Sequence, residues 1–593
     1  MYTTSSILLK SLADNGITHI FVNWGSDHPA LLEDLQRQRK EGDGKTEPQI
    51  ITCPNEMVAL SAAQGFTQAT GRPAAVIVHV DVGTQALAGA VHNVDRGRAP
   101  VLIYAGASPF SRLGEMKGSR NEWILSVQDV PDQPSIVRQY MRYTAQIPSG
   151  KVAAQVVNRA LQIATSHPKG PVYLWARRET TEEEIDAALF NSGPSPRKWP
   201  AIEPTALSTA AAGTIATASP SSQSTSNRHL AHWPIPVIAT CASAVAVPFS
   251  HPFFLGTTFL NGRTHTSRLA EADVIIVLDS DVPWIEGIQP PNEHARVFVI
   301  DSGDPLKTIS SVGQWHVDAA LICNADAALA LSAIIAIVES SNISVDMIQQ
   351  RAAELIASHK EWVHSLDVLE DTWPNGVPGD VRATLPNFLG VLRRTIAQLV
   401  PSGGLDKTLV VNEGITNYPL VWDHMRTEAP GMHITSGGSS LGWGLAAAIG
   451  ASLGGRENYE LIVGIIGDGS YLFGVPSSAF WIARRYQTPF LTIVINNGGW
   501  KAPKLSMLGC HLTGHGSLAS SGVELSVGFG PDVPDYSQIA VAASAGWVWG
   551  KRIGTGEHGR NLQTEIDTAM AEAVRVVLEE KRCAVLDCVL DSF

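Results

Sequence analysis

Cysteine is scarce in this chain. Only six of its 593 residues are cysteines, and no two of them form a Cys-x-x-Cys pair. This pattern excludes the common structural zinc sites and a disulfide-bonded scaffold. Thiols scattered in this way are typical of a reducing compartment, so we expect a cytoplasmic protein.

Long hydrophobic runs are also missing. No apolar run reaches the roughly 18 residues that cross a membrane. The segment 1–12 lacks the charged and then apolar pattern of a secretory signal. The C-terminal Asp591-Ser592-Phe593 is not a peroxisomal signal. We therefore expect no membrane partner.

Positive charge is not in excess. The net charge is −13 and the isoelectric point is about 5.8. A nucleic-acid-binding surface usually needs clustered Lys and Arg, so this balance predicts no nucleic-acid partner. Hydrophobic residues make up 44% and charged residues 17% of the chain, as in ordinary globular enzymes.

The chain is too long for a single core, and its composition divides it into blocks. Apolar strands alternate with helical segments at both ends, which predicts α/β domains with parallel sheets. We expect an N-terminal domain (1–185), a Ser/Thr/Ala-rich flexible linker (186–232), a shortened central domain (233–345), a second linker (346–385) and a C-terminal domain (386–593). The first and last domains share a βα rhythm and are expected to be related.

The most informative motif is Gly467-Asp468-Gly469-Ser470, which is followed after one helix-length segment and one strand by Asn496-Asn497. The helix is expected over 471–487. This βαβ unit brings the carboxylate of Asp468 and the amide oxygen of Asn497 to the carboxyl edge of a parallel sheet, where ligands bind. With the carbonyl of Gly499 they form an all-oxygen set suited to Mg²⁺. The glycines allow backbone N–H groups to approach a diphosphate.

This spacing resembles the thiamine-diphosphate (ThDP) motif of the 2-oxoacid decarboxylase and acetolactate synthase superfamily. The resemblance implies a three-domain ThDP-enzyme architecture, with ThDP and Mg²⁺ as cofactors. It also implies that Asp468, Asn497 and Gly499 bind the metal. Family members that bind FAD or ADP do so in the central domain, and the short central block here gives no basis for either nucleotide.

A second motif places Glu56 at a strand-to-helix junction, before a helix rich in small residues at 59–65. It resembles the family signature whose glutamate hydrogen-bonds N1′ of the aminopyrimidine and so activates the cofactor. A plain helix N-cap is the alternative. Because Glu56 and Asp468 lie in different domains, the resemblance implies that two subunits complete each site, as a homodimer or a dimer of dimers.

The remaining cofactor contacts are expected in the C-terminal domain. The resemblance assigns them to Gly414, Ile415, Thr416, Ser439, Leu441, Gly467, Gly469, Ser470 and Trp500. In this assignment Leu441 supports the bent cofactor, and the Ser439 carbonyl accepts from its amino group. Leu441 as ordinary core packing is the alternative.

Three polar residues resemble the active site of benzoylformate decarboxylases. They are Ser26 after the first strand, His79 four residues before Gly83-Thr84, and His251 after the first central strand. A histidine with a near-neutral pKa can transfer protons during decarboxylation. Other positions depart from the decarboxylases: Pro503 stands where pyruvate decarboxylases have an acid, and Lys501 stands where benzoylformate decarboxylases have a glycine. The roles of Lys501, Asp81, His511 and His515 stay open.

The resemblance implies an enzyme that decarboxylates a 2-oxo acid through an enamine. The products would be an aldehyde, a 2-hydroxyketone formed with an aldehyde or ketone acceptor, or both. An acetolactate synthase-like activity and a 2-hydroxyacyl-CoA lyase are alternatives. A non-catalytic regulatory subunit with the ThDP fold is an alternative of another class, although it would not need Glu56, Asp468 and Asn497 together.

Overall fold

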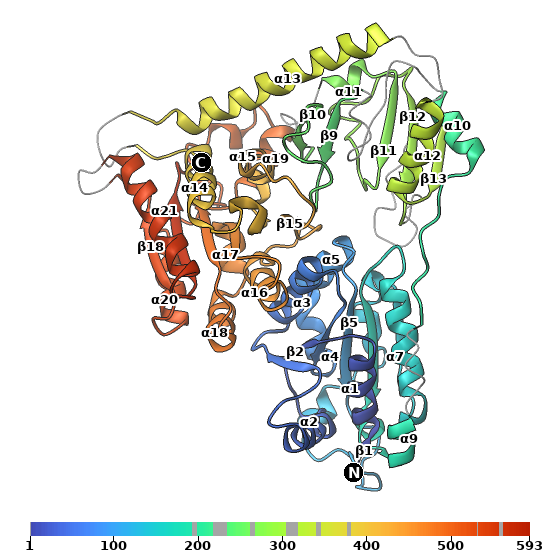
Figure 1. Ribbon diagram of the computed structural model, residues 1–593. Coiled ribbons are helices and arrows are strands. Elements are labelled where there is room, and N and C mark those ends of the chain that lie inside the picture. Colours follow the sequence, from blue (N-terminus) through green and yellow to red (C-terminus); the bar gives the residue numbers. More distant parts are fainter. Residues whose placement is uncertain are drawn as a thin grey trace.

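The computed structural model describes residues 2–192, 199–217, 234–260, 267–303, 318–339, 345–375, 381–530, 532–556 and 561–593. Its two largest layers are six-stranded parallel sheets, one near each end of the chain, with helices on both faces (Figure 1). This is the mixed α/β fold that the sequence predicts. No helix in these ranges is both long and apolar enough to cross a bilayer.

The N-terminal sheet has the order β3-β2-β4-β5-β7-β6. Its strands are β2 (His19–Val22), β3 (Gln49–Thr52), β4 (Ala74–Val78), β5 (Val101–Ala107), β6 (Tyr143–Gln146) and β7 (Val172–Arg177). Its helices are α1 (Thr4–Asp14), α2 (Pro29–Glu41), α3 (Glu56–Thr70), α4 (Val80–Ala86), α5 (Ala88–Arg96), α6 (Ile124–Val127), α7 (Gly150–Thr165), α8 (Arg178–Thr181) and α9 (Ala187–Ser192). A small antiparallel pair, β1 (Tyr2–Thr3) with β8 (Glu184–Ile185), joins its two ends.

The C-terminal sheet has the order β15-β14-β16-β17-β19-β18. Its strands are β14 (Thr408–Glu413), β15 (His433–Thr435), β16 (Leu461–Gly467), β17 (Leu491–Asn496), β18 (Trp549–Ile553) and β19 (Ala584–Val589). Its helices are α14 (Leu385–Leu399), α15 (Tyr418–Met425), α16 (Gly444–Gly454), α17 (Asp468–Phe473), α18 (Pro476–Tyr486), α19 (Lys501–Cys510), α20 (Tyr536–Ala543) and α21 (Leu562–Leu578).

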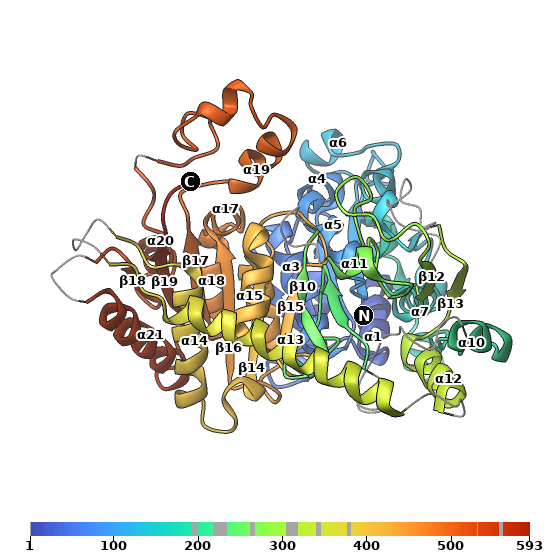
Figure 2. The same ribbon diagram turned by 90° about the horizontal axis from the view of Figure 1, so that it is seen from above.

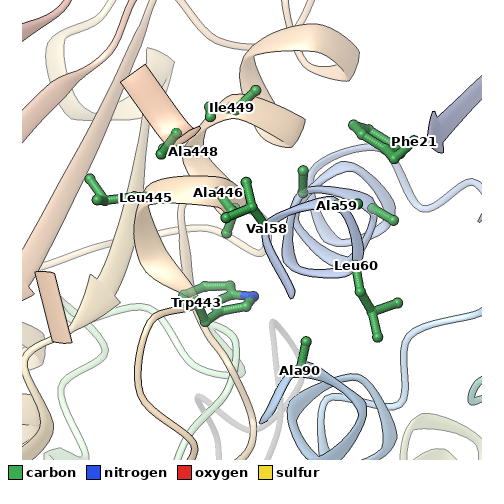
Figure 3. Packing of buried hydrophobic residues seen from close by; sticks show 14 of the residues in the cluster. Phe21, Val58, Ala59, Leu60, Ala90, Trp443, Leu445, Ala446, Ala448 and Ile449 are labelled. Carbon is green, nitrogen blue, oxygen red and sulfur yellow. The ribbon is translucent and has the colours of Figure 1, made fainter. Parts of the chain in front are cut away.

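The two large sheets have the same topology. Taken in chain order, the strands of each are arranged second-first-third-fourth-sixth-fifth. Helices α3 and α16 occupy equivalent places, after the second strand of each sheet, and they pack directly on each other (Figure 3). The relation that the sequence predicted between the two end domains is therefore present in the fold.

Small residues make this helix pair possible. A Cβ at Gly65 would lie 2.2 Å from the Ala447 carbonyl oxygen, and one at Gly450 would lie 1.8 Å from that of Ala62. Both helices therefore approach to backbone contact.

The central region forms two small parallel sheets rather than one. β9 (Val237–Thr240) pairs with β10 (Phe254–Thr258), and β11 (Val274–Leu278), β12 (Arg296–Asp301) and β13 (Leu321–Asn324) form the other. Its helices are α10 (Thr209–Ala216), α11 (Arg268–Glu271) and α12 (Ala327–Glu339). The predicted domain boundaries stay predictions.

Both predicted linkers contain helices. The segment 186–232 is not a flexible linker throughout, because α10 buries Ala212 and Ile215 in a cluster with α12. Residues 193–198 and 218–232 lie outside the described part of the chain. The expected linker 346–385 consists mainly of α13 (Val345–Asp371), which crosses from the central region to α14 (Figure 2).

The single helix expected over 471–487 is wrong as well. Two helices, α17 and α18, cover this segment and are separated at Gly474 and Val475. Val475 has a positive φ of 48° and precedes Pro476. A proline disfavours the α conformation of the residue before it, so the chain turns here and starts a new helix.

Candidate active site

The predicted motif around Asp468 converges as the βαβ pattern indicates. Strands β16 and β17 are hydrogen-bonded parallel neighbours. Asp468 begins α17 at the end of β16 and is 2% exposed. Its Oδ2 accepts hydrogen bonds from the backbone N–H groups of Gly498 at 2.8 Å and Gly499 at 2.9 Å, just after β17. One carboxylate thus joins the ends of two strands.

The two asparagines of the motif have different surroundings. The Nδ2 of Asn496 donates to Asp587 Oδ1 at 2.8 Å, which ties β17 to β19. The Oδ1 of Asn497 is buried and has no hydrogen-bond partner among the described residues, and neither has the Oγ of Ser470. A buried oxygen without a partner is costly, so these two atoms mark a place that a ligand would complete.

The charge of Asp468 supports the same interpretation. Burial raises the pKa of Asp468 to about 7, although the N–H groups of Gly469, Gly499 and Gly498 favour the ionised form. No Lys, Arg or His side chain in the described ranges forms an ion pair with it. A divalent cation beside Asp468 and Asn497 would supply the missing positive charge, and oxygen ligands of these kinds are those that Mg²⁺ prefers. The residues present fit the metal.

The turn that follows Asn497 depends on glycine. Gly498 and Gly499 have φ values of 82° and 148°. A Cβ at Gly499 would lie 2.3 Å from the Val527 carbonyl oxygen, and one at Gly469 would lie 2.5 Å from Trp500 Nε1. The Trp500 indole therefore covers the turn after Asp468, while 44% of the residue stays exposed.

Residues 412–417 form the next turn at the same sheet edge. The Asn412 Oδ1 accepts from the Gly414 N–H at 3.0 Å, and its buried Nδ2 has no partner in the described ranges. Ile415 has a φ of 49°, a strained conformation for a β-branched residue, and Thr416 follows it in a short 3₁₀ turn. Strain held in such a turn is common where backbone N–H groups are arranged for a ligand.

Glu413 holds a third turn, residues 442–444, which directly follows Leu441. Its buried carboxylate accepts from the N–H groups of Gly442 at 2.6 Å, Trp443 at 3.1 Å and Gly444 at 2.7 Å. Burial raises the pKa of Glu413 to about 7 against the effect of these three bonds. Leu441 is half-buried directly before this turn. Sequence reasoning did not single out Glu413.

The N-terminal domain also fixes this loop. The Asn93 Nδ2 donates to the Ser440 carbonyl at 2.8 Å, and the Ser440 N–H donates to the Asn93 Oδ1 at 3.1 Å. The Ser439 N–H donates to His92 Nε2 at 3.2 Å. Helix α5 of one domain therefore positions the loop of the other in which Ser439 and Leu441 lie. The contacts of His92 and Asn93 were not predicted.

Glu56 lies at the first residue of α3, where the sequence places it. Asn55 caps the helix by accepting from the Val58 N–H at 3.1 Å. The Glu56 carboxylate is half-buried, and a Cβ at Gly83 would lie 3.5 Å from its Oε1. Within the described part of the chain no hydrogen bond or ion pair joins Glu56 to Asp468.

His79 and Ser26 lie at the carboxyl edge of the N-terminal sheet. His79 follows β4 and hydrogen-bonds through Nδ1 to Asp27 Oδ1 and through Nε2 to Gln128 Oε1, the latter at 2.9 Å. Burial disfavours its charge, but the hydrogen bond and the charge of Asp27 raise the pKa of His79 above its usual value. The Ser26 Oγ donates to Glu122 Oε2 at 2.9 Å.

His251 is not brought to the other two residues. It lies between β9 and β10, and its Nδ1 accepts from the Phe253 N–H at 3.3 Å. Burial, with a smaller effect of His359, lowers the pKa of His251. The neighbouring Ser250 donates to Glu428 in the C-terminal domain. In the described ranges no hydrogen bond or ring contact joins His251 to Ser26 or His79.

The residues whose roles the sequence leaves open lie in different settings. Asp81 is buried two residues after His79, with its Oδ1 unpaired among the described residues. Lys501 begins α19, a helix that buries no side chain and stands away from the sheet (Figure 2). His511 and His515 follow it in the same protruding segment. Leu512 and Leu518 are 77% and 81% exposed there.

Two parallel sheets of one topology, with glycine-rich turns at their carboxyl ends, place the protein in the class of open α/β proteins that bind ligands at strand ends. Residues 2–134 match the family "Thiamine pyrophosphate enzyme, N-terminal TPP binding domain", and residues 414–588 match its C-terminal TPP binding domain. The chain belongs to the thiamine pyrophosphate enzyme family.

The chain is similar to curated relatives over most of its length. A benzoylformate decarboxylase of Pseudomonas aeruginosa is 24% identical, with 85% of this chain and 87% of the relative covered. A sulfoacetaldehyde acetyltransferase of Rhodobacter capsulatus is 26% identical, with 85% and 83% covered. A solved 4-hydroxybenzoylformate decarboxylase of Rhodococcus jostii has a TM-score of 0.71 at 18% identity, with 100% and 99% covered. This structural likeness shows the fold.

Proposed function

We propose that the protein is a ThDP- and Mg²⁺-dependent enzyme that acts on 2-oxo acids, by decarboxylation with aldehyde release, by carboligation to a 2-hydroxyketone, or by both. The observation that carries this proposal is the pairing of the buried Asp468 with the buried Oδ1 of Asn497 at the ends of β16 and β17. An unneutralised carboxylate and an unpaired amide oxygen meet there in a chain that contains both TPP binding domains.

The metal would be held by Asp468, by Asn497 Oδ1 and by the Gly499 carbonyl. The diphosphate would lie against the metal, the N–H groups of 414–416 and 467–469, and the Ser470 hydroxyl. Leu441 and Ser439 would contact the bent cofactor between its rings. When bound, ThDP supplies a nucleophilic carbon and an electron sink for loss of CO₂. The protein's part is to orient the substrate, exclude water and hold protons.

Glu56 is proposed as the carboxyl group that meets the aminopyrimidine. Because no hydrogen bond or ion pair joins Glu56 to Asp468 in the described ranges, we propose a homodimer in which one copy contributes Glu56 and the other contributes Asp468.

Ser26 and His79 would bind the carboxylate of the 2-oxo acid and deliver a proton to the carbon that loses CO₂. His251 would approach the same site from the copy that contributes Asp468. The names of two relatives, a benzoylformate decarboxylase and a 4-hydroxybenzoylformate decarboxylase, support a 2-oxo acid as substrate. A non-catalytic subunit would not need Glu56, Asp468 and Asn497 to be kept in these settings.

Cofactor binding tests the proposal most directly. Calorimetric titration with ThDP should show binding with Mg²⁺ and none after chelation with EDTA. Asp468→Ala should abolish this binding, since the diphosphate would meet Asp468 through the metal. Asp535→Ala is a matched control: Asp535 also lies at a helix start of the same domain, where it caps α20. This variant should keep ThDP affinity.

Turnover then tests the catalytic part. A panel of 2-oxo acids, with and without added aldehydes, should reveal CO₂ release. Glu56→Gln should bind ThDP nearly as well as the natural protein but turn over at least ~10²-fold more slowly, as expected for a lost acid–base group. ThDP binding by Asp468→Ala at full affinity would contradict the assignment of the site. Full turnover by Glu56→Gln would place the activating carboxyl group elsewhere.

A further inference from the structure

Two glycines make room for a buried pair behind the proposed substrate site. The pair consists of Asp27, which is 1% exposed, and His79, whose side chain is 14% exposed. A Cβ at Gly25, after β2, would collide with the His79 ring, and a Cβ at Gly106, in β5, would collide with the Asp27 carboxylate. Two different strands thus leave space for this one contact.

Both ring nitrogens of His79 face oxygen acceptors. Nδ1 meets Asp27 Oδ1, and Nε2 meets Gln128 Oε1 at 2.9 Å. The loop that contains Gln128 is held in turn, because the Ser108 hydroxyl donates to the Gln128 carbonyl. A neutral imidazole has only one N–H, so with the Gln128 amide in this orientation one of the ring's lone pairs would face an oxygen lone pair. The doubly protonated ring satisfies both contacts.

The groups around this pair favour an ionised Asp27 and a cationic His79. His28 Nε2 lies 3.2 Å from Asp27 Oδ2, and burial lowers the pKa of His28. Burial opposes the charge of Asp27, but His28 and His79 lower its pKa. Burial raises the pKa of Tyr104, and the nearby carboxylate of Asp27 adds to this effect.

The other charged or titratable neighbours do not oppose this arrangement. Asp81 adds negative charge near His79 and raises its pKa further. Tyr173 packs behind Asp81 with its hydroxyl bonded to Thr84 and Gln133, and burial raises the pKa of Tyr173 to about 12. A neutral phenol leaves the charge balance of the pair unchanged.

We propose that Asp27 and Gln128 are positioning residues that hold His79 as an imidazolium, so that His79 acts as a proton donor through the Nε2–H that Gln128 Oε1 accepts when no substrate is bound. Its use as a donor rests on the proposed function, whereas its charge state does not. In the transfer, the Nε2–H bond breaks and the proton goes to the carbon that has lost CO₂. The ring becomes neutral, keeps its Nδ1–H bond to Asp27, and regains a proton from water.

The charge state is tested without any activity measurement. In protein with ¹³C-labelled histidine rings, His79→Gln identifies the His79 signal among the 18 histidines by its disappearance. The pKa of His79 should lie above 6.5, and Asp27→Asn should lower it by about 1 to 3 units, since an adjacent carboxylate stabilises the cation by that order. Gln128→Ala should lower it less, and Gln128→Glu should raise it.

A matched control is Asp34→Asn. Asp34 is a buried carboxylate of the same domain that accepts from Ser6 and Arg37 and does not contact His79. This change should leave the His79 pKa where it is. An unchanged His79 pKa in both Asp27→Asn and Gln128→Ala would overturn the proposal. So would a neutral His79 at pH 6 in the natural protein. If Asp27→Asn does not fold, the two Gln128 variants decide.

The donor role is tested by the pH dependence of kcat. Activity should fall as pH rises through the His79 pKa, and in Asp27→Asn the fall should occur at lower pH by the same interval as in the spectra. A kcat profile that does not follow the measured pKa would refute the donor role while leaving the charge state intact. Absence of turnover on every 2-oxo acid, with the spectral shift present, would count against the proposed function alone.

Discussion

The contact between α3 and α16 allows a quantitative prediction, because the same substitution has opposite consequences at different glycines. Gly450 lies in the middle of α16, and a Cβ there would fall 1.8 Å from the Ala62 carbonyl oxygen of α3. Ordinary contact begins near 3.4 Å, and the obstacle is backbone rather than a flexible side chain. Gly450→Ala therefore forces the two helices apart.

The size of the effect follows from two opposing terms. Overpacking a core costs about 1–3 kcal/mol and sometimes more. Replacing a helical glycine with alanine returns about 1 kcal/mol of backbone entropy. Because a rigid carbonyl blocks the new methyl group, we expect the upper part of the overpacking range and a net loss of about 2 kcal/mol or more.

Two glycines provide matched controls. Gly213 in α10 and Gly509 in α19 are helical, and neither has an atom within 4 Å of an added Cβ. Gly213→Ala and Gly509→Ala should be neutral or stabilising by up to about 1 kcal/mol. Urea unfolding followed by circular dichroism gives the midpoints. ThDP affinity should also fall in Gly450→Ala alone, because the loop at 436–443 leads into α16.

The opposite result would be decisive. If Gly450→Ala unfolds at the same urea concentration as the two controls, or at a higher one, then α3 and α16 do not approach to backbone contact in the protein. The backbone contact between α3 and α16 would then not be what holds the two sheets together.

Two further predictions concern titratable groups. Burial lowers the pKa of His433, stacked on Trp422, to about 3; the unfolded chain then binds more protons between about pH 3 and 6.5, and stability falls as pH falls through that window. His433→Phe removes this loss. The stability of the variant relative to that of the natural protein should therefore be about 2 kcal/mol higher at pH 5 than at pH 8. An identical pH dependence of both urea midpoints would refute this. Cys510 is exposed, whereas Cys53, Cys583 and Cys588 are buried, with thiol pKa values raised by burial. The reaction of the folded protein with Ellman's reagent should include a fast phase that is absent in Cys510→Ser. Rapid reaction of the three buried thiols in the folded protein would contradict their placement.

The strands that the sequence predicts are those buried on both faces. β4, β5, β16 and β17 are continuous apolar runs in the middle of their sheets, and such runs are typical of parallel strands. The edge strands were not predicted. β6 (Tyr143–Gln146) and β18 (Trp549–Ile553) are half-exposed and mix polar with apolar residues, because one side of each borders solvent.

Some residues of the candidate site could likewise be predicted from the sequence, and others could not. Asp468, Asn497 and Glu56 could be found because their positions follow from local motifs at strand ends. Asp27 and Gln128 could not, because they meet His79 only after residues about 50 apart in sequence come together, at separations of 52 and 49. Glu413 directly precedes the predicted contacts Gly414, Ile415 and Thr416, yet its role depends on three N–H groups some 30 residues later.

The two large sheets share one topology, so the residues of the candidate site lie at the ends of equivalent strands in the two domains. In the N-terminal sheet the first strand, β2, is followed by Ser26, and the third strand, β4, is followed by His79. In the C-terminal sheet the first strand, β14, is followed by the turn 414–416, and the third strand, β16, is followed by Asp468. Equivalent strand ends thus present groups suited to proton transfer in one domain and to a metal and a diphosphate in the other. The turns differ. At the C-terminal edge the Asp468 carboxylate accepts from the N–H groups of two glycines, whereas at the N-terminal edge Asp27 faces His79. Glu56 lies in the N-terminal domain and Asp468 in the C-terminal domain, so a site that uses both residues must combine the edges of the two sheets.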